Sequence, residues 1–287
     1  MRGPKVVALG GGHGLSSTLL AVRRYAGDVT AVVSVADDGG SSGRLRTALG
    51  IPPPGDLRKC LIALGDSSSL WGRALDHRFD GGELDGHALG NLLIAGLAIT
   101  SGDFITAVDE VGRLVGAVGR VLPATNSPVV LAAEAACGRV EGQVAIARTP
   151  HISRVEVCPA DVEPPPAVLE AIAAADQIVI GPGSLYTSVL AVVVIPDVGD
   201  ALKRTSARKV YVCNLRPQVP ETEGYDLAAH LGALANHGLE VDDVVCDPSQ
   251  LDVGEVGVPC HRLDLALEDG SGHDPVKLGG ILATLRG

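Results

Sequence analysis

A glycine-rich segment near the N-terminus has the residue types that bind phosphate. Residues 10–16 read Gly-Gly-Gly-His-Gly-Leu-Ser and follow Lys5–Leu9, an apolar run that predicts a buried strand. Glycines let backbone N–H groups approach an anion, and a helix N-terminus favours negative charge. The spacing is neither a dinucleotide fingerprint nor a P-loop. A tight strand–helix turn is the alternative to the predicted ligand contacts at Gly11, Gly12, His13, Gly14, Leu15 and Ser16.

A second polar segment follows the next predicted strand, Val29–Val35. Residues 37–46 read Asp-Asp-Gly-Gly-Ser-Ser-Gly-Arg-Leu-Arg. Asp side chains bind magnesium or ribose hydroxyls, and arginine holds phosphate through two parallel hydrogen bonds. An exposed charged turn is the alternative. We predict ligand contacts at Asp37, Asp38, Gly39, Gly40, Ser41, Ser42 and Arg44, with Asp37 and Asp38 as candidate magnesium ligands.

Two further segments place polar groups at the start of predicted helices. Asp56 either contacts the ligand or caps a helix over 56–64. Arg58 opposes the dipole of that helix unless an anion or a carboxylate compensates it, so we count it among the ligand contacts. His87 and Asn91 are four residues apart and share one helix face, either as ligand contacts or as a buried polar pair.

Two later loops repeat the pattern. Residues 181–188 read Gly-Pro-Gly-Ser-Leu-Tyr-Thr-Ser between a predicted strand and a predicted helix, which again predicts an anion cradle, here with hydroxyls. Asn214 follows the predicted strand Lys209–Cys213, where a polar solvent turn is the alternative. The predicted contacts in these loops are Gly183, Ser184, Tyr186, Thr187 and Asn214. At least three such loops suit a ligand with more than one phosphate.

The elements that position these loops alternate between short β-rich runs and helical segments of 10–15 residues. That alternation predicts βαβ units, a mostly parallel sheet and one α/β domain over 1–287. The stretch 119–157 reads as a small β-rich insertion, with strands at 119–122, 129–133, 144–147 and 153–157. In an open parallel sheet, ligands bind outside the carboxyl ends of the strands.

Composition excludes several classes of function. The 287 residues carry a net charge of −11, which argues against general duplex-DNA binding, and 2% aromatics disfavour a base-stacking single-strand binder. No run approaches the ~18 apolar residues of a membrane span, and no signal peptide is evident. The six cysteines lack a zinc-type spacing. We expect reduced, mostly buried thiols and a cytoplasmic protein.

Taken in order, the motifs resemble the YvcK-type gluconeogenesis factors. The resemblance rests on residues 10–16, 36–46, 53–61, 86–92, 181–188 and 211–214, and it extends over nearly the whole chain. That group is similar to 2-phospho-L-lactate transferase. The relationship implies a Rossmann-like three-layer α/β/α fold with a nucleotide or phosphoryl group in the crevice. The transferases use magnesium with acidic residues, which is why Asp37 and Asp38 inherit a metal role.

The resemblance favours a regulator over an enzyme. It implies binding of UDP-N-acetylglucosamine and control of carbon metabolism, cell-wall synthesis and cell shape without turnover. The implied partners are cell-wall-synthesis proteins, and we expect a homodimer. A magnesium-dependent transferase acting on a nucleotide donor is the alternative, and a dinucleotide-dependent oxidoreductase fits less well. Two positions depart from the family pattern, because His13 replaces a common Thr and Pro220 replaces a common Gly.

Overall fold

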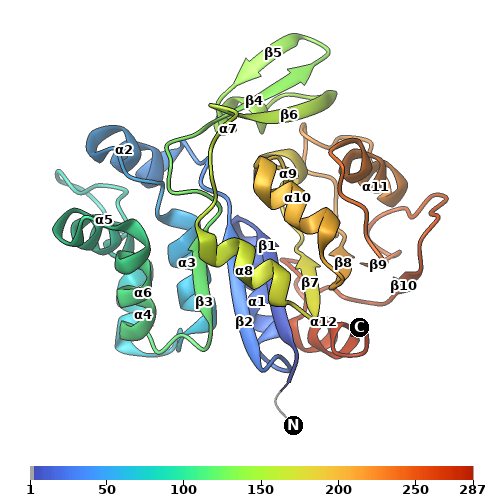
Figure 1. Ribbon diagram of the computed structural model, residues 1–287, viewed down its shortest axis with the longest axis horizontal. Helices are drawn as coiled ribbons and strands as arrows, with labels where there is room; N and C mark the ends of the chain where they lie inside the picture. Colours follow the sequence, from blue (N-terminus) through green and yellow to red (C-terminus); the bar gives the residue numbers. More distant parts are fainter. Residues whose placement is uncertain (1–2, 287) are drawn as a thin grey trace.

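Seven strands form the main sheet of the computed structural model, which describes residues 3–286 (Figure 1). Their order is β10-β9-β8-β7-β1-β2-β3, and every neighbouring pair is parallel. The predicted α/β class with a mostly parallel sheet is confirmed. The bounds are β1 Lys5–Gly10, β2 Asp28–Val33, β3 Arg120–Pro123, β7 Gln177–Ile180, β8 Arg208–Val212, β9 Asp243–Cys246 and β10 Cys260–Arg262.

Helices cover both faces of this sheet, which makes three layers. Helices α1, α3 and α12 pack on one face, and α8, α9 and α10 lie on the other (Figure 1). Because both faces are covered, central strands such as β7 and β9 consist only of buried residues. The helices are α1 Gly12–Val22, α2 Gly40–Leu49, α3 Gly55–Leu64, α4 Leu70–Asp76, α5 Leu89–Ser101, α6 Phe104–Leu114, α7 Gln143–Ile146, α8 Pro166–Ala174, the π-helical turn η1 Leu185–Val189, α9 Leu190–Val193, α10 Pro196–Arg204, α11 Leu227–Asn236 and α12 Pro275–Leu282.

The strand order reverses between β1 and β7. From β1 the chain builds outward through β2 and β3, and from β7 it builds the other way through β8, β9 and β10. Such a reversal is called a topological switch point. In a doubly wound sheet, the loops that follow the two strands at this point run in opposite directions, which leaves a crevice between them at the carboxyl ends of the strands. The loops after β1 and β7 are the two glycine-rich segments 10–16 and 181–184.

A small antiparallel sheet stands above that carboxyl edge (Figure 1). Its order is β5-β4-β6, formed by β4 Val130–Ala135, β5 Gly138–Glu141 and β6 Ile152–Cys158. The strand predicted at 119–122 is present as β3 but belongs to the main sheet and not to the insertion. The strand predicted at 144–147 is wrong, since helix α7 spans Gln143–Ile146. The cause is a tertiary contact, because the Asp38 carboxylate accepts a hydrogen bond from the Val144 N–H at 3.0 Å and so caps that helix.

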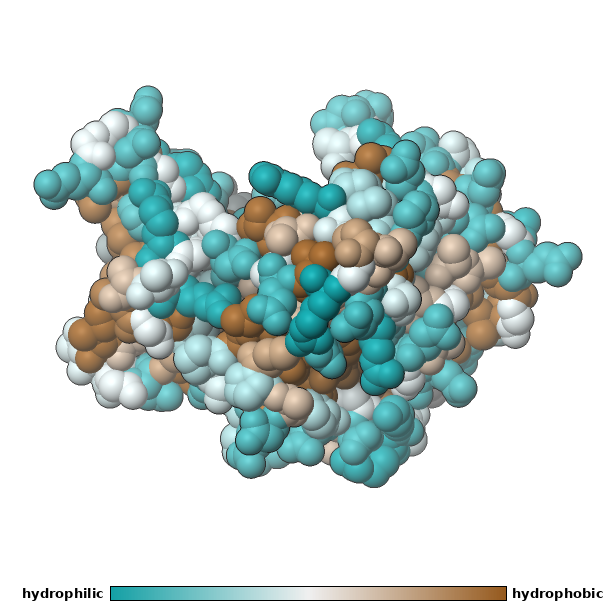
Figure 2. All heavy atoms as spheres, turned by 90° about the horizontal axis from the view of Figure 1, so that it is seen from above, coloured by the Kyte–Doolittle hydropathy of each residue, from teal (hydrophilic) through white to brown (hydrophobic). Residues whose placement is uncertain are grey.

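The core is aliphatic, as the composition predicts, and Tyr186 and Tyr211 are its largest fully buried side chains. Some apolar surface stays open on the side of α4 and α5, where Leu70, Trp71 and Ile99 are exposed; Figure 2 shows hydrophobic atoms gathered at that edge of the molecule. Within residues 3–286 no single helix is long and apolar enough to cross a membrane. One pair, 185–193 with 196–204, passes on length and composition but is bent by 76°.

Candidate functional site

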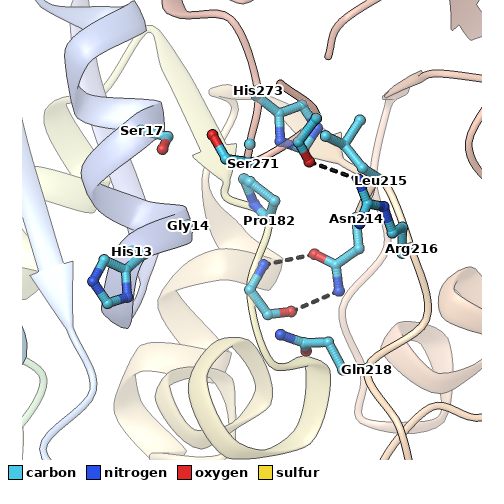
Figure 3. A pocket seen from close by; sticks show the side chains of 13 residues that line it. His13, Gly14, Ser17, Pro182, Asn214, Leu215, Arg216, Gln218, Ser271 and His273 are labelled. Carbon is cyan, nitrogen blue, oxygen red and sulfur yellow. Dashed lines mark hydrogen bonds between the residues drawn. The ribbon is translucent and has the colours of Figure 1, made fainter. Parts of the chain in front are cut away.

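The loops after β1 and β7 touch each other at the switch point. A Cβ atom added to Gly14 would lie 1.9 Å from the Pro182 carbonyl oxygen, so only glycine lets α1 approach the 181–184 loop this closely. Asn214, after β8, braces the second loop. Its side-chain oxygen accepts from the Gly183 N–H at 2.7 Å, and its Nδ2 donates to the Gly183 carbonyl at 2.8 Å (Figure 3).

The N-terminus of α1 already holds a carboxylate of the chain itself. Oδ2 of Asp56 accepts the Gly12 N–H at 2.7 Å, and Oδ1 accepts from Lys59 Nζ at 3.0 Å. Asp56 therefore does not cap its own helix, α3, which begins at Gly55 after Pro54. A ligand phosphate at this helix end would meet the Asp56 carboxylate first.

The other two glycine-rich helix starts are occupied in the same way. Oδ1 of Asp37 accepts the Gly39 N–H at 2.9 Å, where α2 begins. Glu221 reaches the start of η1, where Oε1 accepts from the backbone N–H groups of Tyr186 at 2.7 Å and Thr187 at 3.2 Å, and Oε2 accepts from the Thr187 hydroxyl. All three predicted cradles thus contain a carboxylate. The sequence shows the glycine-rich loops and the acidic residues, but it does not show that these carboxylates accept hydrogen bonds from the backbone of the loops.

The adjacent residues Asp37 and Asp38 point to different places. Asp38 is exposed and caps α7, whereas Asp37 is half-buried and lies near Asp56. Burial raises the pKa of the Asp37 carboxyl, the Gly39 N–H opposes that rise, and the Asp56 carboxylate adds to it. The two carboxylates that lie close together are therefore those of Asp37 and Asp56, rather than those of Asp37 and Asp38.

The part of the chain that the structure describes forms no metal cluster from protein side chains alone. Among residues 3–286, no group of three or more His, Cys, Asp or Glu side chains is arranged to hold a metal ion. Magnesium usually keeps several waters and binds through one or two carboxylates plus substrate phosphates. Asp37 and Asp56 fit that pattern, with the remaining positions left for water and a ligand.

His13 and Lys59 bring a polar and a positive group close to Asp56. His13 is exposed at the first turn of α1. The positive charge of Lys59, followed by partial burial, lowers the pKa of His13, so its imidazole is neutral at pH 7. A neutral imidazole donates one hydrogen bond and accepts another. Lys59 is absent from the predicted contacts, although it stands beside Arg58 in the sequence.

Ser41 joins His87 and Asn91 into one network beside the cleft. The Ser41 hydroxyl lies 2.9 Å from His87 Nδ1 and 3.0 Å from Asn91 Nδ2. Asn91 is buried and His87 is half-buried, so the two residues form a hydrogen-bonded polar cluster with Ser41, and ligand contact by His87 stays a prediction. Burial, followed by the nearby Arg44 and Arg78, lowers the pKa of His87. Arg44 itself is exposed and donates to the Asp85 carbonyl at 2.7 Å.

Four of the predicted contacts are taken up by packing inside the fold. Arg58 is 3% exposed and pairs with Asp76 of α4, which is the compensating carboxylate that its helix position requires. Leu15 lies wholly in the core, because α1 packs that face on the sheet. Tyr186 and Thr187 are buried, and the Tyr186 hydroxyl hydrogen-bonds to the Ile152 carbonyl and to Tyr225.

The remaining predicted residues form the loop framework. Gly11 is packed against Asp56 and Ser188, and the Ser16 hydroxyl donates to the Gly12 carbonyl at 3.1 Å. The Ser42 hydroxyl accepts the Gly55 N–H at 3.2 Å, which ties the second loop to α3. Gly40 has a φ of +49° with open space around it, and Ser184 precedes η1 beside Glu221.

A pocket of about 250 Å³ opens beside Gly14 on the β7–β8 side. Figure 3 shows Ser17 reaching it from α1, with Asn214 and Arg216 opposite. Its wall also includes residues 270–273, where Arg216 Nη2 donates to the Gly270 carbonyl at 2.6 Å. Sequence reasoning missed the lining residues Ser17, Leu215, Arg216, Gln218, Ser271 and His273. Residues 215–218 could have been identified, because they continue the loop after β8 that contains Asn214. Residues 270–273 have no sequence motif that would connect them with the other lining residues.

The buried His273 makes the stability of the protein depend on pH. Burial lowers its pKa to about 4, and Nε2 lies 3.1 Å from the Cys213 carbonyl oxygen, to which it donates. As the pH falls from 6.5 to 4, the unfolded chain binds a proton here and the folded chain does not. We expect this histidine to lower the free energy of unfolding by about 3 kcal/mol over that range.

Urea unfolding of the wild type and of H273Q at pH 7 and pH 4.5 measures the effect. H273Q is expected to be less stable at pH 7, with the difference shrinking in acid. H77Q, at an exposed position, is the control and should follow the wild type at both pH values. An H273Q deficit that stays constant with pH contradicts the assignment.

Comparisons with known proteins agree with the motifs. The model of the 2-phospho-L-lactate transferase CofD family matches residues 6–257. The gluconeogenesis factor of Halalkalibacterium halodurans is 46% identical over 251 residues, covering 85% of this chain and 78% of that protein. That of Bacillus subtilis is 46% identical over 237 residues, covering 82% and 75%. The crystal structure of a UPF0052 family member from Bacillus halodurans has a TM-score of 0.93 at 39% identity, covering 98% of this chain and 99% of that one.

Proposed function

Because this chain belongs to the CofD family, we propose that it acts as a gluconeogenesis factor that binds a nucleotide sugar of the UDP-N-acetylglucosamine type without converting it. The relatives that match most of its length bear the name gluconeogenesis factor. In this proposal it is a cytoplasmic homodimer that passes its ligand state to proteins of carbon metabolism and cell-wall synthesis.

The observation that supports the proposal is the polar pocket at the switch point. His13 and Arg216 both line this pocket, and the positive charge of Lys59 lies close enough to His13 to lower its pKa. A diphosphate spanning the Gly14–Pro182 contact would meet positive charge at both ends. Since Asp37 and Asp56 repel an anion, a magnesium ion between these carboxylates and the phosphates would lower that repulsion. Magnesium is therefore expected to strengthen binding.

The alternative is a magnesium-dependent transferase, and one observation favours it. The carboxylates of Asp37 and Asp56 lie near each other, and metal-held phosphoryl groups are the basis of electrostatic catalysis in such enzymes. The regulator is preferred because each cradle carboxylate is engaged by backbone N–H groups or Lys59 in a mainly structural role. Product formation separates the two functions.

Calorimetric titration with UDP-N-acetylglucosamine, with and without magnesium, tests both functions when the same mixtures are then analysed for UDP. Binding with intact ligand supports the regulator, and release of UDP supports the transferase. We expect K59M to weaken binding about tenfold or more, since a hydrogen bond to a charged group contributes about 1.5–3 kcal/mol.

K203M is the matched control, because Lys203 is an exposed lysine of α10 outside the cleft. It should bind as the wild type does. Equal losses in K59M and K203M would show only a general charge effect. Absence of binding to the wild type under both magnesium conditions would overturn the proposal.

A further inference from the structure

Two cysteines lie side by side at one end of the sheet, outside the residues that the proposed function uses. Cys246 ends β9 and Cys260 begins the neighbouring strand β10. Their Sγ atoms are 3.4 Å apart. The strands pair Cys260 with Val244 and Arg262 with Cys246, so the two cysteines are diagonal neighbours in register. A disulfide has an S–S distance of about 2.05 Å, so each sulfur need move only about 0.7 Å.

We infer that Cys246 and Cys260 are a redox modification site, at which a peroxide converts the two thiols into an intramolecular disulfide. Cys260 is half-buried and can meet the oxidant, whereas Cys246 is 2% exposed. The Cys260 thiolate attacks the peroxide O–O bond, giving a sulfenic acid and hydroxide. The Cys246 sulfur then displaces the sulfenic oxygen, which leaves as water after protonation, and the S–S bond forms. In total, two thiols and one hydrogen peroxide give one disulfide and two waters.

The order of the two steps follows from the surroundings of each sulfur. Burial, together with the neighbouring Cys260, raises the pKa of the Cys246 thiol, so it stays protonated and unreactive toward the oxidant. It is nevertheless held against Cys260, which makes it the resolving partner. Sensor cysteines commonly consist of an accessible thiol beside a second, resolving one.

The modification acts on the wall of the pocket. Asp247, next to Cys246, accepts from the Leu265 N–H at 2.8 Å and from the Ala266 N–H at 3.3 Å. That segment leads from β10 to residues 270–273, which line the pocket. A covalent link at the start of β10 closes the loop 247–259 and fixes the strand from which this wall continues. We expect oxidation to stiffen residues 263–273.

The test uses the full-length, fully reduced protein treated with hydrogen peroxide. The expected result is a loss of two free thiols per chain and a Cys246–Cys260 linked peptide by mass spectrometry, both reversed by dithiothreitol. Closing a loop of this size should raise Tm by about 5 °C. Hydrogen–deuterium exchange of residues 263–273 should slow on oxidation.

Two variants decide the assignment, and each is first checked for an unchanged Tm in the reduced state. C260S should lose the linked peptide, the Tm rise and the slower exchange. C137S, which changes an exposed cysteine, should retain all three. Oxidation that consumes Cys137 or Cys158 while the 246–260 peptide stays reduced overturns the inference. So does a Tm rise of the same size in C260S. None of these three readouts depends on nucleotide-sugar binding.

Discussion

Gly14→Ala should unfold the centre of the molecule or leave it barely stable. The added methyl group would lie 1.9 Å from the Pro182 carbonyl oxygen and 2.6 Å from its carbon, both backbone atoms that cannot move aside alone. Either α1 or the 181–184 loop must shift, and both are packed on the sheet at its switch point. We expect a loss of about 4 kcal/mol or more in the free energy of unfolding.

Urea unfolding of the purified variant measures this loss. Gly96→Ala is the matched control, because Gly96 lies inside α5 with nothing within 4 Å of the added carbon. There alanine should leave stability unchanged or raise it by up to about 1 kcal/mol. If Gly14→Ala is as stable as Gly96→Ala, the close contact between the two loops does not exist in solution.

Glu221→Ala is expected to have the second largest effect. Glu221 is 2% exposed, and its carboxylate receives two backbone N–H groups and one hydroxyl at the start of η1. Burial raises the pKa of Glu221, while these donors oppose the rise. Removing the side chain leaves the donors buried without a partner. We expect a destabilisation of about 3 kcal/mol.

The conservative variant and a neighbouring position isolate the cause. Glu221→Gln keeps one acceptor oxygen and should lose about half as much as Glu221→Ala, whereas Glu223→Ala, at an exposed position, should change little. All are compared by urea unfolding at pH 7. Equal stability of Glu221→Ala and Glu223→Ala would show that the carboxylate does not hold η1.

The fold class could be predicted because the alternation of apolar strands and helices is visible in short stretches of the sequence, and that alternation is typical of a parallel α/β sheet. The glycine loops could also be placed, since each follows a strand. Their partners could not be read from the sequence. Asp56 looks like a helix cap, yet its acceptor role is toward Gly12, 44 positions away. The short run 144–147 has strand composition, but the distant Asp38 carboxylate makes it a helix start.

Arg58 shows the same limit for charges. Its position in the first turn of α3 calls for a negative partner, and the sequence cannot distinguish a bound anion from a carboxylate of the chain. The structure supplies Asp76. Residues 270–273 line the pocket but carry no recognisable motif. They lie in the connection between β10 and α12, so only the folded chain brings them to the pocket, and local sequence patterns could not identify them.

The position of β1 in the sheet also affects how the protein is made. β1 pairs with β7, whose first residue, Gln177, is partner to Val6. At a synthesis rate of about 5–20 residues per second, β7 leaves the ribosome roughly 10–35 seconds after β1. Throughout that interval one edge of β1 has no neighbouring strand. In the finished fold Val6–Gly10 of this strand are buried. The nascent chain therefore carries an open, apolar strand edge for most of its synthesis, the kind of surface that chaperones bind and that pairs wrongly when crowded.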